Sequence, residues 1–332
     1  MSNAVRIDGR GVGVELFEWL DIRARAEMAT WAEDHGFNGV YMAEVTDPDV
    51  FVTLGVVGAA TRRVRLAPLV AQLGPRSAPM MASSAAAVAN VAPGRFVLGL
   101  GVSSAAIVDG WHGVPWSQPL VRARESVIAI RSILAGGRTD LAGEQVRSKG
   151  FALAMPPDPA PPIFLAAANP GMIRVAAEVA DGVMLTFLPV ERAAEVVAAI
   201  RTAALAVDRP QPEVVLSIMC EVTDDAHRAR RRLREVMLFY VSVPAYRRYL
   251  SGLGYGEEMA AAEAAFAARD RAAARLAVTD ALIDSISLIG TAAQVRDRLE
   301  QYLDAGIDSP AVAAMDRDTA YDTLRALAPG PR

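Results

Sequence analysis

The sequence predicts an α/β protein of the (β/α)8 TIM-barrel class, and three observations predict it. First, eight apolar runs of strand length occur along the 332 residues, each followed by a segment of helical pattern, and eight such units close a parallel barrel. Second, 52% of the residues are hydrophobic, which provides for a large buried core. Third, the glycine-rich first turn of a doubly wound sheet is absent: Gly99 and Gly101 lie at the fourth strand, and Ser104 occupies the third glycine position. We therefore expect a single domain over residues 1–332, with insertions after strands four and seven.

The first half of the chain contains four regular units. Asp21 is expected to cap the first helix, which Gly36 ends. The apolar run at 96–102 lies between a Pro93-Gly94 turn and a Gly/Ser-rich segment, which is typical of a strand buried on both faces. The expected strands are 11–17, 38–44, 64–72 and 96–102, and the expected helices are 22–35, 49–60, 78–91 and 119–135.

The second half continues the rhythm around two insertions. Residues 137–160 contain turn residues and a proline cluster, which indicates a small hairpin. Residues 225–280 are charged, Ala-rich and helical, and we expect the helix at 260–276 to be a solvated outer layer. The remaining strands are expected at 163–168, 182–187, 214–222 and, as the eighth, 286–290, with helices at 171–180, 190–207 and 292–305 and a short tail at 311–315.

Composition excludes several functional classes. The net charge is −4 and no long basic block occurs, so nucleic acid and anionic membranes are unexpected partners. Cys220 is the single cysteine, which excludes an internal disulfide and a cysteine-based zinc site, and we expect it to be a small buried hydrophobe. No signal peptide and no apolar run of membrane-spanning length is seen, so the cytoplasm is the expected compartment.

Chemistry in a barrel lies at the carboxyl ends of the strands. Those ends are rich in small groups and poor in strong acids and bases. The three histidines fall on a helix end, a loop and an outer helix, so no metal site is expected. Lys149, the only lysine, lies in the first insertion rather than at a strand end, so Schiff-base chemistry is not expected either. Such a barrel favours an organic cofactor that carries the reaction. The strand-end candidates are Glu44, Val70–Gln72, Val102–Ser104, Ala167–Gly171, Thr186, Glu221 and Gly290-Thr291.

Each candidate also has a structural interpretation. The helix start at Asn169, Pro170, Gly171 and Met172 could hold a cofactor phosphate on its N–H groups, or be an ordinary start with proline. Glu44 is either functional or a capping or salt-bridging carboxylate. Trp111 and His112 either line a pocket or belong to a loop packed on the barrel rim. His35, at a helix C-terminus, is expected to be structural.

Several segments together resemble the bacterial luciferase-like monooxygenase superfamily, and within it the actinobacterial oxidoreductases that use the deazaflavin coenzyme F420. The likeness covers roughly residues 11–190 and continues near Gly290-Thr291. The matching segments are 35–44 (HGFNGVYMAE), 61–66 (TRRVRL), 94–103 (GRFVLGLGVS), 110–116 (GWHGVPW), 122–125 (RARE), 162–167 (PIFLAA) and 178–182 (EVADG).

The resemblance implies a (deaza)flavin ring at the carboxyl-terminal mouth of the barrel. It implies a cis non-proline peptide at Leu69-Val70, forming a bulge behind the ring. It also implies that the ring lies along strand ends two, four and five. The residues it implies for the cofactor site are Glu44, Leu69, Val70, Gly101, Val102, Ser103, Ala167, Ala168, Asn169, Pro170, Gly171 and Met172.

The sequence departs from the family at informative positions. Sugar-phosphate dehydrogenases of the superfamily place His and Glu acid/base groups where this chain has Val45 and Ser104, so a sugar phosphate is not the expected substrate. The turn after strand five carries Asn169-Pro170-Gly171 rather than the usual Gly-Pro or Gly-Gly.

Three functional hypotheses follow. The first is an F420-dependent oxidoreductase that transfers a hydride to or from a small organic substrate, with Glu44, Trp111 and His112 as candidate catalytic or substrate-contacting residues. The second is an FMN-dependent monooxygenase on the same barrel. The third is a cofactor-binding protein without turnover. The resemblance also implies a homodimer formed through barrel helices, which the Ala-rich helical faces permit.

Overall fold

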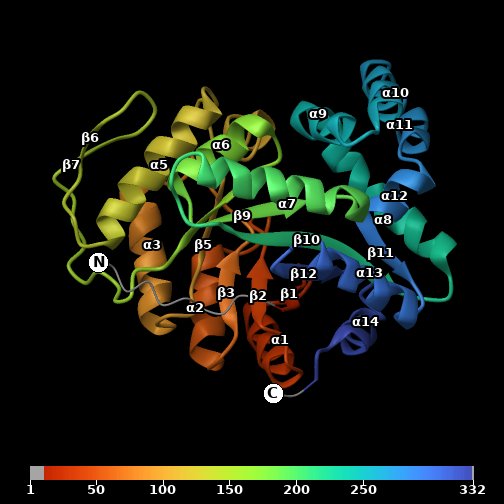
Figure 1. Cartoon of the computed structure of the whole chain (residues 1–332), viewed down its shortest axis with the longest axis horizontal. Coiled ribbons are helices and arrows are strands. Elements are labelled where there is room, and N and C mark those ends of the chain that lie inside the picture. The colour runs from red at the N-terminus through yellow and green to blue at the C-terminus, as the bar shows by residue number, and fades with distance from the viewer. Residues whose placement is uncertain (1–10, 331–332) are drawn as a thin grey trace.

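A ring of parallel strands forms the centre of the computed structural model, which describes residues 11–330 (Figure 1). The predicted bounds 1–332 and the expected absence of a signal peptide involve residues 1–10 and 331–332, which lie outside the described part. The order around the ring is β3-β2-β1-β12-β10-β9-β8-β5-β4. The strands are β1 (Gly13–Glu15), β2 (Gly39–Met42), β3 (Arg65–Pro68), β4 (Ala71–Gln72), β5 (Leu98–Gly101), β8 (Ile163–Ala166), β9 (Gly182–Thr186), β10 (Glu213–Val222) and β12 (Ser309–Ala314).

The predicted third strand is present but interrupted. β3 and β4 are its two halves, separated by the cis peptide bond between Leu69 and Val70. A parallel bridge between Leu66 and Phe96 joins β3 to the segment before β5 and closes the ring. The ring therefore has the eight strand positions of a (β/α)8 barrel, as predicted.

Helices follow the strands and cover the ring. The cap predicted at Asp21 is present, since its carboxylate accepts a hydrogen bond from the Ala24 N–H. The helix predicted at 78–91 is observed with those bounds, while the short α4 was not predicted. The helices of the barrel are α1 (Ile22–Asp34), α2 (Val50–Ala60), α3 (Ala78–Val91), α4 (Ala105–Val108), α5 (Pro119–Leu134), α6 (Pro170–Val179), α7 (Val190–Leu205), α13 (Ala292–Asp304) and α14 (Ala320–Leu327).

The position of the eighth strand was predicted wrongly. A strand does form at β11 (Ser287–Gly290), but it pairs only with the second half of β10 and lies off the ring. The predicted tail instead forms β12, which pairs with both β1 and β10. Both segments are short apolar runs, and only the long-range pairing with β1 distinguishes them.

The lower half of the barrel is filled with side chains. Tyr41 fits there because Gly13 has no side chain: a Cβ at Gly13 would lie 2.4 Å from the Tyr41 ring. The Tyr41 hydroxyl and the Ser309 hydroxyl are 2.8 Å apart and hydrogen-bonded. Below them Arg65 forms a bidentate ion pair with Glu213. Because this end is closed, a ligand can reach the barrel interior only from the carboxyl-terminal mouth.

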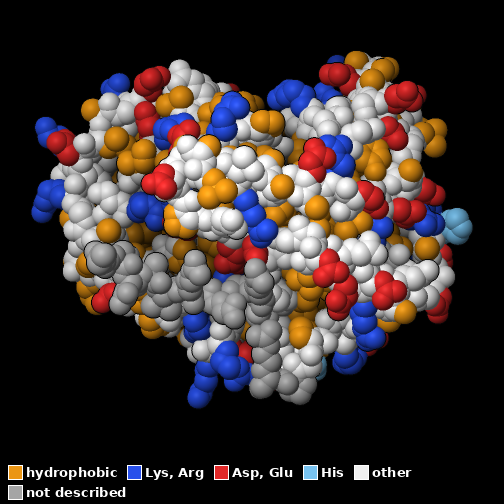
Figure 2. Space-filling model, viewed as in Figure 1, with side chains coloured by type: hydrophobic (Ala, Val, Ile, Leu, Met, Phe, Trp, Pro, Cys, Tyr) orange, Lys and Arg blue, Asp and Glu red, His pale blue; other side chains and the backbone are white. Residues whose placement is uncertain are grey.

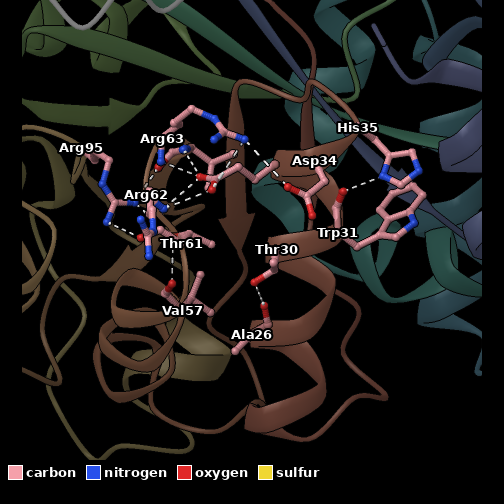
Figure 3. Close-up of polar contacts among 12 residues, drawn as sticks. Ala26, Thr30, Trp31, Asp34, His35, Val57, Thr61, Arg62, Arg63 and Arg95 are labelled. Carbon is pink, nitrogen blue, oxygen red and sulfur yellow. Dashed lines mark hydrogen bonds and ion pairs between the residues drawn. The ribbon is translucent and has the colours of Figure 1, made fainter. Parts of the chain in front are cut away.

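The closed end is also secured from outside, as Figure 3 shows. The Glu33 carboxylate, at the end of α1, accepts hydrogen bonds from the backbone N–H groups of Arg62, Arg63 and Val64 just before β3. His35 stacks on Trp31 with ring centroids 4.0 Å apart, and its Nδ1 lies 2.7 Å from the Trp31 carbonyl oxygen. His35 is therefore structural, as the sequence indicated.

The two insertions form separate elements. The first is an antiparallel hairpin of β6 (Asp140–Ala142) and β7 (Arg147–Lys149), as predicted. The second is helical, with its own hydrophobic cluster, and lies beside the ring at the upper right of Figure 1. Its helices are α8 (Ala226–Ser242), α9 (Pro244–Gly252), α10 (Gly256–Ala267), α11 (Arg271–Ala277) and α12 (Asp280–Ile286).

The segment 260–276 is a largely exposed outer layer, as expected, but it forms two helices rather than one. It is divided between α10 and α11, and Ala262, Ala265 and Ala274 are buried in the insertion. These small alanine side chains let one face of each helix pack closely on the insertion, while the opposite face is solvated.

The surface carries mixed charges. On the face shown in Figure 2, acidic and basic side chains are interspersed with apolar ones, and the outline is indented between α6 and the α9–α11 region. None of the helices in residues 11–330 is long and apolar enough to cross a bilayer. Cys220 is free and fully buried, and burial raises the pKa of its thiol, in keeping with the predicted role as a small hydrophobe.

Candidate functional site at the mouth of the barrel

Alternating burial marks an open mouth at the carboxyl ends of the strands. Near the ends of β1, β2, β8, β9, β10 and β12, inner-face residues are partly exposed while most of their neighbours along the chain are buried. One layer lower, the inner-face residues Ala67, Val97 and Phe164 are buried. The barrel is thus packed below and open above. We call the partly exposed set the mouth positions: Glu15, Ala43, Ala166, Thr186, Ser217, Met219 and Ala313.

Glu15, at the end of β1, is the one ionisable residue among the mouth positions. Burial raises the pKa of its carboxyl to about 7, although a hydrogen bond donated by the Ser217 hydroxyl to Oε1 acts in the opposite direction. At neutral pH this group is divided between its acid and its carboxylate. It can therefore donate or accept a proton beside a bound molecule.

Sequence reasoning missed Glu15. It lies inside the first predicted strand, between the buried Val14 and Leu16. A single carboxylate in an otherwise apolar strand is a usable signal, because burying a charge is expensive unless the group has a purpose or a partner. Its partner Ser217 is 202 positions away in the chain.

The bulge at Leu69-Val70 forms one wall of the mouth. Both residues are partly exposed and pack on the inner layer of the barrel. Gly101 makes room for it, since a Cβ there would lie 2.4 Å from Val70 Cγ2. Directly after β5, Val102 and Ser103 are partly exposed, and Ser103 has a φ of 60°.

Glu44 is engaged with protein groups. Its Oε2 accepts hydrogen bonds from the Gln72 backbone N–H at 3.0 Å and from Arg76 Nη1 at 2.8 Å. Arg76 also contacts Asp49, with 2.6 Å between Nη2 and Oδ2. The contacts correspond to the salt-bridging interpretation of Glu44 and tie the end of β2 to the segment before α3.

The start of α6 lies after β8. Ala167 is buried and Ala168 is partly exposed, while Asn169 and Pro170 are exposed. The Asn169 side chain caps the helix by accepting a hydrogen bond from the Met172 N–H at 3.0 Å. That N–H is therefore already satisfied within the chain.

Beside this helix start lies a cavity of about 440 Å³. It is outside the ring, between α5 and α6, and Gly171 contributes to its wall. A second cavity, of about 410 Å³, lies between α7, α12 and α13 and contains Tyr255 and Arg298.

Trp111 and His112 lie in the turn after α4. Both are exposed, Trp111 by 53%. The tryptophan that contacts the end of the fourth barrel strand is Trp116, whose Nε1 donates a hydrogen bond to the Val102 carbonyl at 3.2 Å. The predicted residues of strands two, three, four and five thus lie at the carboxyl ends of neighbouring strands, and Trp111 and His112 are exposed in the loop after β5.

Comparison with known proteins agrees with this architecture. Residues 6–309 match the family model of luciferase-like monooxygenases. The chain is 29% identical to 5,10-methylenetetrahydromethanopterin reductase of Methanolobus tindarius, over 89% of this chain and 91% of the relative. It is 27% identical to a Mycobacterium tuberculosis protein provisionally named a coenzyme F420-dependent oxidoreductase, over 95% of this chain and 98% of the relative.

A solved structure has the same fold. The coenzyme F420-dependent tetrahydromethanopterin reductase of Methanopyrus kandleri superposes with a TM-score of 0.80 at 21% identity, covering 96% of this chain and 98% of that one. The family match extends over most of the chain and over the whole ring of strands up to the start of β12. The chain therefore belongs to the luciferase-like monooxygenase family of oxidoreductases.

Proposed function

We propose that this protein is an F420-dependent oxidoreductase that transfers a hydride between the deazaflavin and a small organic substrate at the mouth of the barrel. The observation that carries the proposal is Glu15, a carboxyl with a pKa of about 7, held by Ser217 among small and apolar mouth positions. The naming of two similar proteins for coenzyme F420 supports the choice of cofactor.

The residues of the mouth fit a flat, polar heterocycle. Three of the seven mouth positions are alanine, and small side chains let a ring lie close to the strands. The Oε1 atom of Gln72 and the hydroxyl of Ser104 are buried and have no hydrogen-bond partner in the described chain. Gln72 ends β4, directly after the bulge, and Ser104 lies three residues after β5, the strand that pairs with β4. The edge of a polar ring could satisfy both atoms there.

The chain's own residues have distinct roles in this proposal. Bound F420 supplies or accepts the hydride. In carbonyl reduction, protonated Glu15 would give its proton to the substrate oxygen, and the resulting carboxylate would regain a proton from solvent. In alcohol oxidation the carboxylate accepts the hydroxyl proton. Ser217 keeps the Glu15 carboxyl oriented.

The predicted cofactor residues take the remaining roles. We propose that the Leu69-Val70 bulge supports one face of the ring and that Gly101, Val102 and Ser103 lie along it. Ala167, Ala168 and the turn from Asn169 to Met172 take the phosphate side. Glu44 acts on the cofactor through the Gln72 and Arg76 contacts, and Trp111 and His112 close over the substrate from the rim.

The test begins with cofactor binding. Purified protein is titrated separately with F420 and with FMN and followed by absorbance and fluorescence. We expect F420 to bind, and reduced F420 to be oxidised by some members of a ketone, enone and imine panel. Binding of FMN alone would favour the monooxygenase hypothesis, and F420 binding without any turnover would favour a binding protein.

Glu15→Gln isolates the proton donor. We expect kcat to fall by about 100-fold, with F420 affinity unchanged, because general acid catalysis contributes on the order of 10²–10⁴. The exposed Glu27→Gln on α1 is the matched control and should retain wild-type rates.

We also propose a homodimer formed through α2 and α3. Residues 50–60 and 78–91 contain no charged side chain, yet these helices face outward from the ring. Exposed apolar residues gather on them: Val52, Val56, Met80 and Val91. An apolar helix face of this kind is normally buried, and a second copy of the chain presents the same face.

A further inference from the structure

An aromatic cluster from the helical insertion lies over the mouth. The rings of Tyr240 (α8) and Tyr246 (α9) are 5.1 Å apart, centroid to centroid, at 84°. Both also meet Phe187, directly after β9, at 4.6 Å and 5.9 Å. Tyr249 fastens α9 to the same strand end, since its hydroxyl donates a hydrogen bond to the Thr186 carbonyl at 3.0 Å.

The same cluster reaches the inner face of the barrel. Met219, a mouth position on β10, packs into the hydrophobic cluster that contains Tyr240 and Tyr246, and so does Met315 after β12. Burial raises the pKa of the Tyr240 hydroxyl, and the negative charge of Glu15 acts in the same direction. Tyr240 thus lies within electrostatic reach of the carboxyl at the end of β1.

The two phenol groups are free to bind a ligand. Within residues 11–330 neither the Tyr240 nor the Tyr246 hydroxyl makes a hydrogen bond, and neither is sealed from solvent. The Tyr249 hydroxyl, by contrast, is used inside the protein. The cluster therefore offers two unused hydrogen-bonding groups on aromatic rings above an apolar mouth.

The charges around the mouth restrict what can bind. Among the mouth positions Glu15 alone is ionisable, and it is partly neutral at pH 7. Arg76, between β4 and α3, is paired with Glu44 and Asp49. None of the mouth positions is cationic, so the charge of an anionic substrate would not be balanced among them and its desolvation would be uncompensated.

We propose that Tyr240 and Tyr246 are specificity-determining residues that select an uncharged, largely apolar carbonyl compound or the corresponding alcohol. The rings cover the apolar body of the substrate, and the hydroxyls hydrogen-bond its oxygen or a second polar group. This inference rests on the proposed function, because it assigns the substrate class of the same site.

Matched substrates and matched variants test it. The substrates are cyclohexanone and its charged counterpart 3-oxocyclohexane-1-carboxylate, with reduced F420 as donor. The variants are Tyr240→Phe and Tyr246→Phe, which each remove one hydroxyl, and Tyr249→Phe as the control. We expect wild-type kcat/KM to favour the neutral compound at least tenfold. Tyr240→Phe and Tyr246→Phe should each raise the KM for the neutral compound about 3- to 10-fold, with kcat changed less than threefold. This is the effect expected from the loss of one hydrogen bond.

Tyr249→Phe should lower stability without altering the preference between the two compounds. A measurement of substrate binding without cofactor separates this inference from the cofactor assignment. It is ligand-detected NMR of cyclohexanone with the protein alone. Weaker binding in both Tyr240→Phe and Tyr246→Phe supports the inference even when no F420 turnover occurs. Equal use of the carboxylate, or unchanged KM and binding in both variants, overturns it while leaving F420 chemistry intact.

Discussion

At the scale of single residues, the most informative side chains are those of a type unusual for their position in the fold. Glu15 is a carboxyl in an apolar strand, and Gly99 and Gly101 are small residues in a strand that could hold larger ones. In each case a neighbour from a distant segment explains the residue. Ser217 holds Glu15, and the β3–β4 bulge takes the space beside the glycines.

The raised pKa of Glu15 predicts a pH-dependent stability. A carboxyl whose folded pKa lies near 7 binds its proton more tightly in the folded state than in the unfolded state. Its contribution is complete below the unfolded value of 4.5 and is lost as the pH rises through 7. Relative to wild type, Glu15→Gln should gain about 2 kcal/mol in unfolding free energy between pH 5 and pH 8.

Urea unfolding across that pH range measures the difference. Glu27→Gln should follow the wild-type curve throughout. Parallel curves for Glu15→Gln and wild type would mean that Glu15 titrates as an ordinary exposed carboxyl.

Gly99 carries a steric prediction. A Cβ at this position would lie 2.1 Å from the Pro68 carbonyl oxygen and 2.7 Å from Met184 Sδ. Gly99→Ala must therefore displace the β3 backbone just before the bulge, and we expect a loss of roughly 2–3 kcal/mol. Gly252→Ala, where nothing lies within 4 Å, should be neutral or slightly stabilising. Thermal unfolding compares the two, and an equal Tm would contradict the close packing at β5.

At the scale of elements, the helical insertion is fastened to the barrel by ion pairs at two strand ends. Arg232 of α8 bonds Glu221 on β10 and also Asp316 after β12, at 2.7 Å from Nη2 to Oδ2. Burial by itself would raise the pKa of Asp316, but hydrogen bonds from Arg228 and the Asp318 backbone N–H, together with the Arg232 charge, hold it below the usual value. This attachment positions α8, and with it Tyr240, over the mouth.

Removing Arg232 should loosen the insertion. Arg232→Met leaves the Glu221 carboxylate, 3% exposed, without its ion-pair partner, and we expect a loss of about 3 kcal/mol. Arg230→Met is the control, because its partner Asp284 is 45% exposed and such pairs contribute less than about 1 kcal/mol. Urea unfolding measures both, and similar effects would show that the buried pair does not anchor α8.

At the scale of the whole molecule, the closed lower barrel and the open mouth confine ligand chemistry to one end. The apolar faces of α2 and α3 are a separate surface, on the side of the ring. Association through them leaves the mouth accessible in each copy, so dimerisation and ligand binding are compatible.

The dimer proposal predicts a monomer when charge is added to that surface. Val56→Glu, at a position 41% exposed on α2, should convert a wild-type dimer to a monomer in sedimentation velocity. Leu276→Glu on α11, 79% exposed, is the control and should remain dimeric. If the wild-type protein is a monomer, there is no dimer. If Val56→Glu is still a dimer, the interface lies elsewhere.

The sequence by itself determined the βα rhythm, most helix bounds and both insertions. Those features depend on local patterns: apolar runs, capping residues such as Asp21, and turn residues. The family resemblance added the cis peptide at Leu69-Val70, which the structure contains. The rhythm, the helix bounds and the insertions each depend on a few neighbouring residues, so they can be predicted from the sequence alone.

Only the tertiary structure decided which strand closes the ring and which side chains meet at its mouth. β11 and β12 look alike as sequences, and pairing with β1 selects β12. Glu15 meets Ser217, and Tyr240 meets Phe187, through the curvature of a closed sheet and the fold of an insertion. Register between strands distant in the chain sets these contacts, and no local pattern encodes that register.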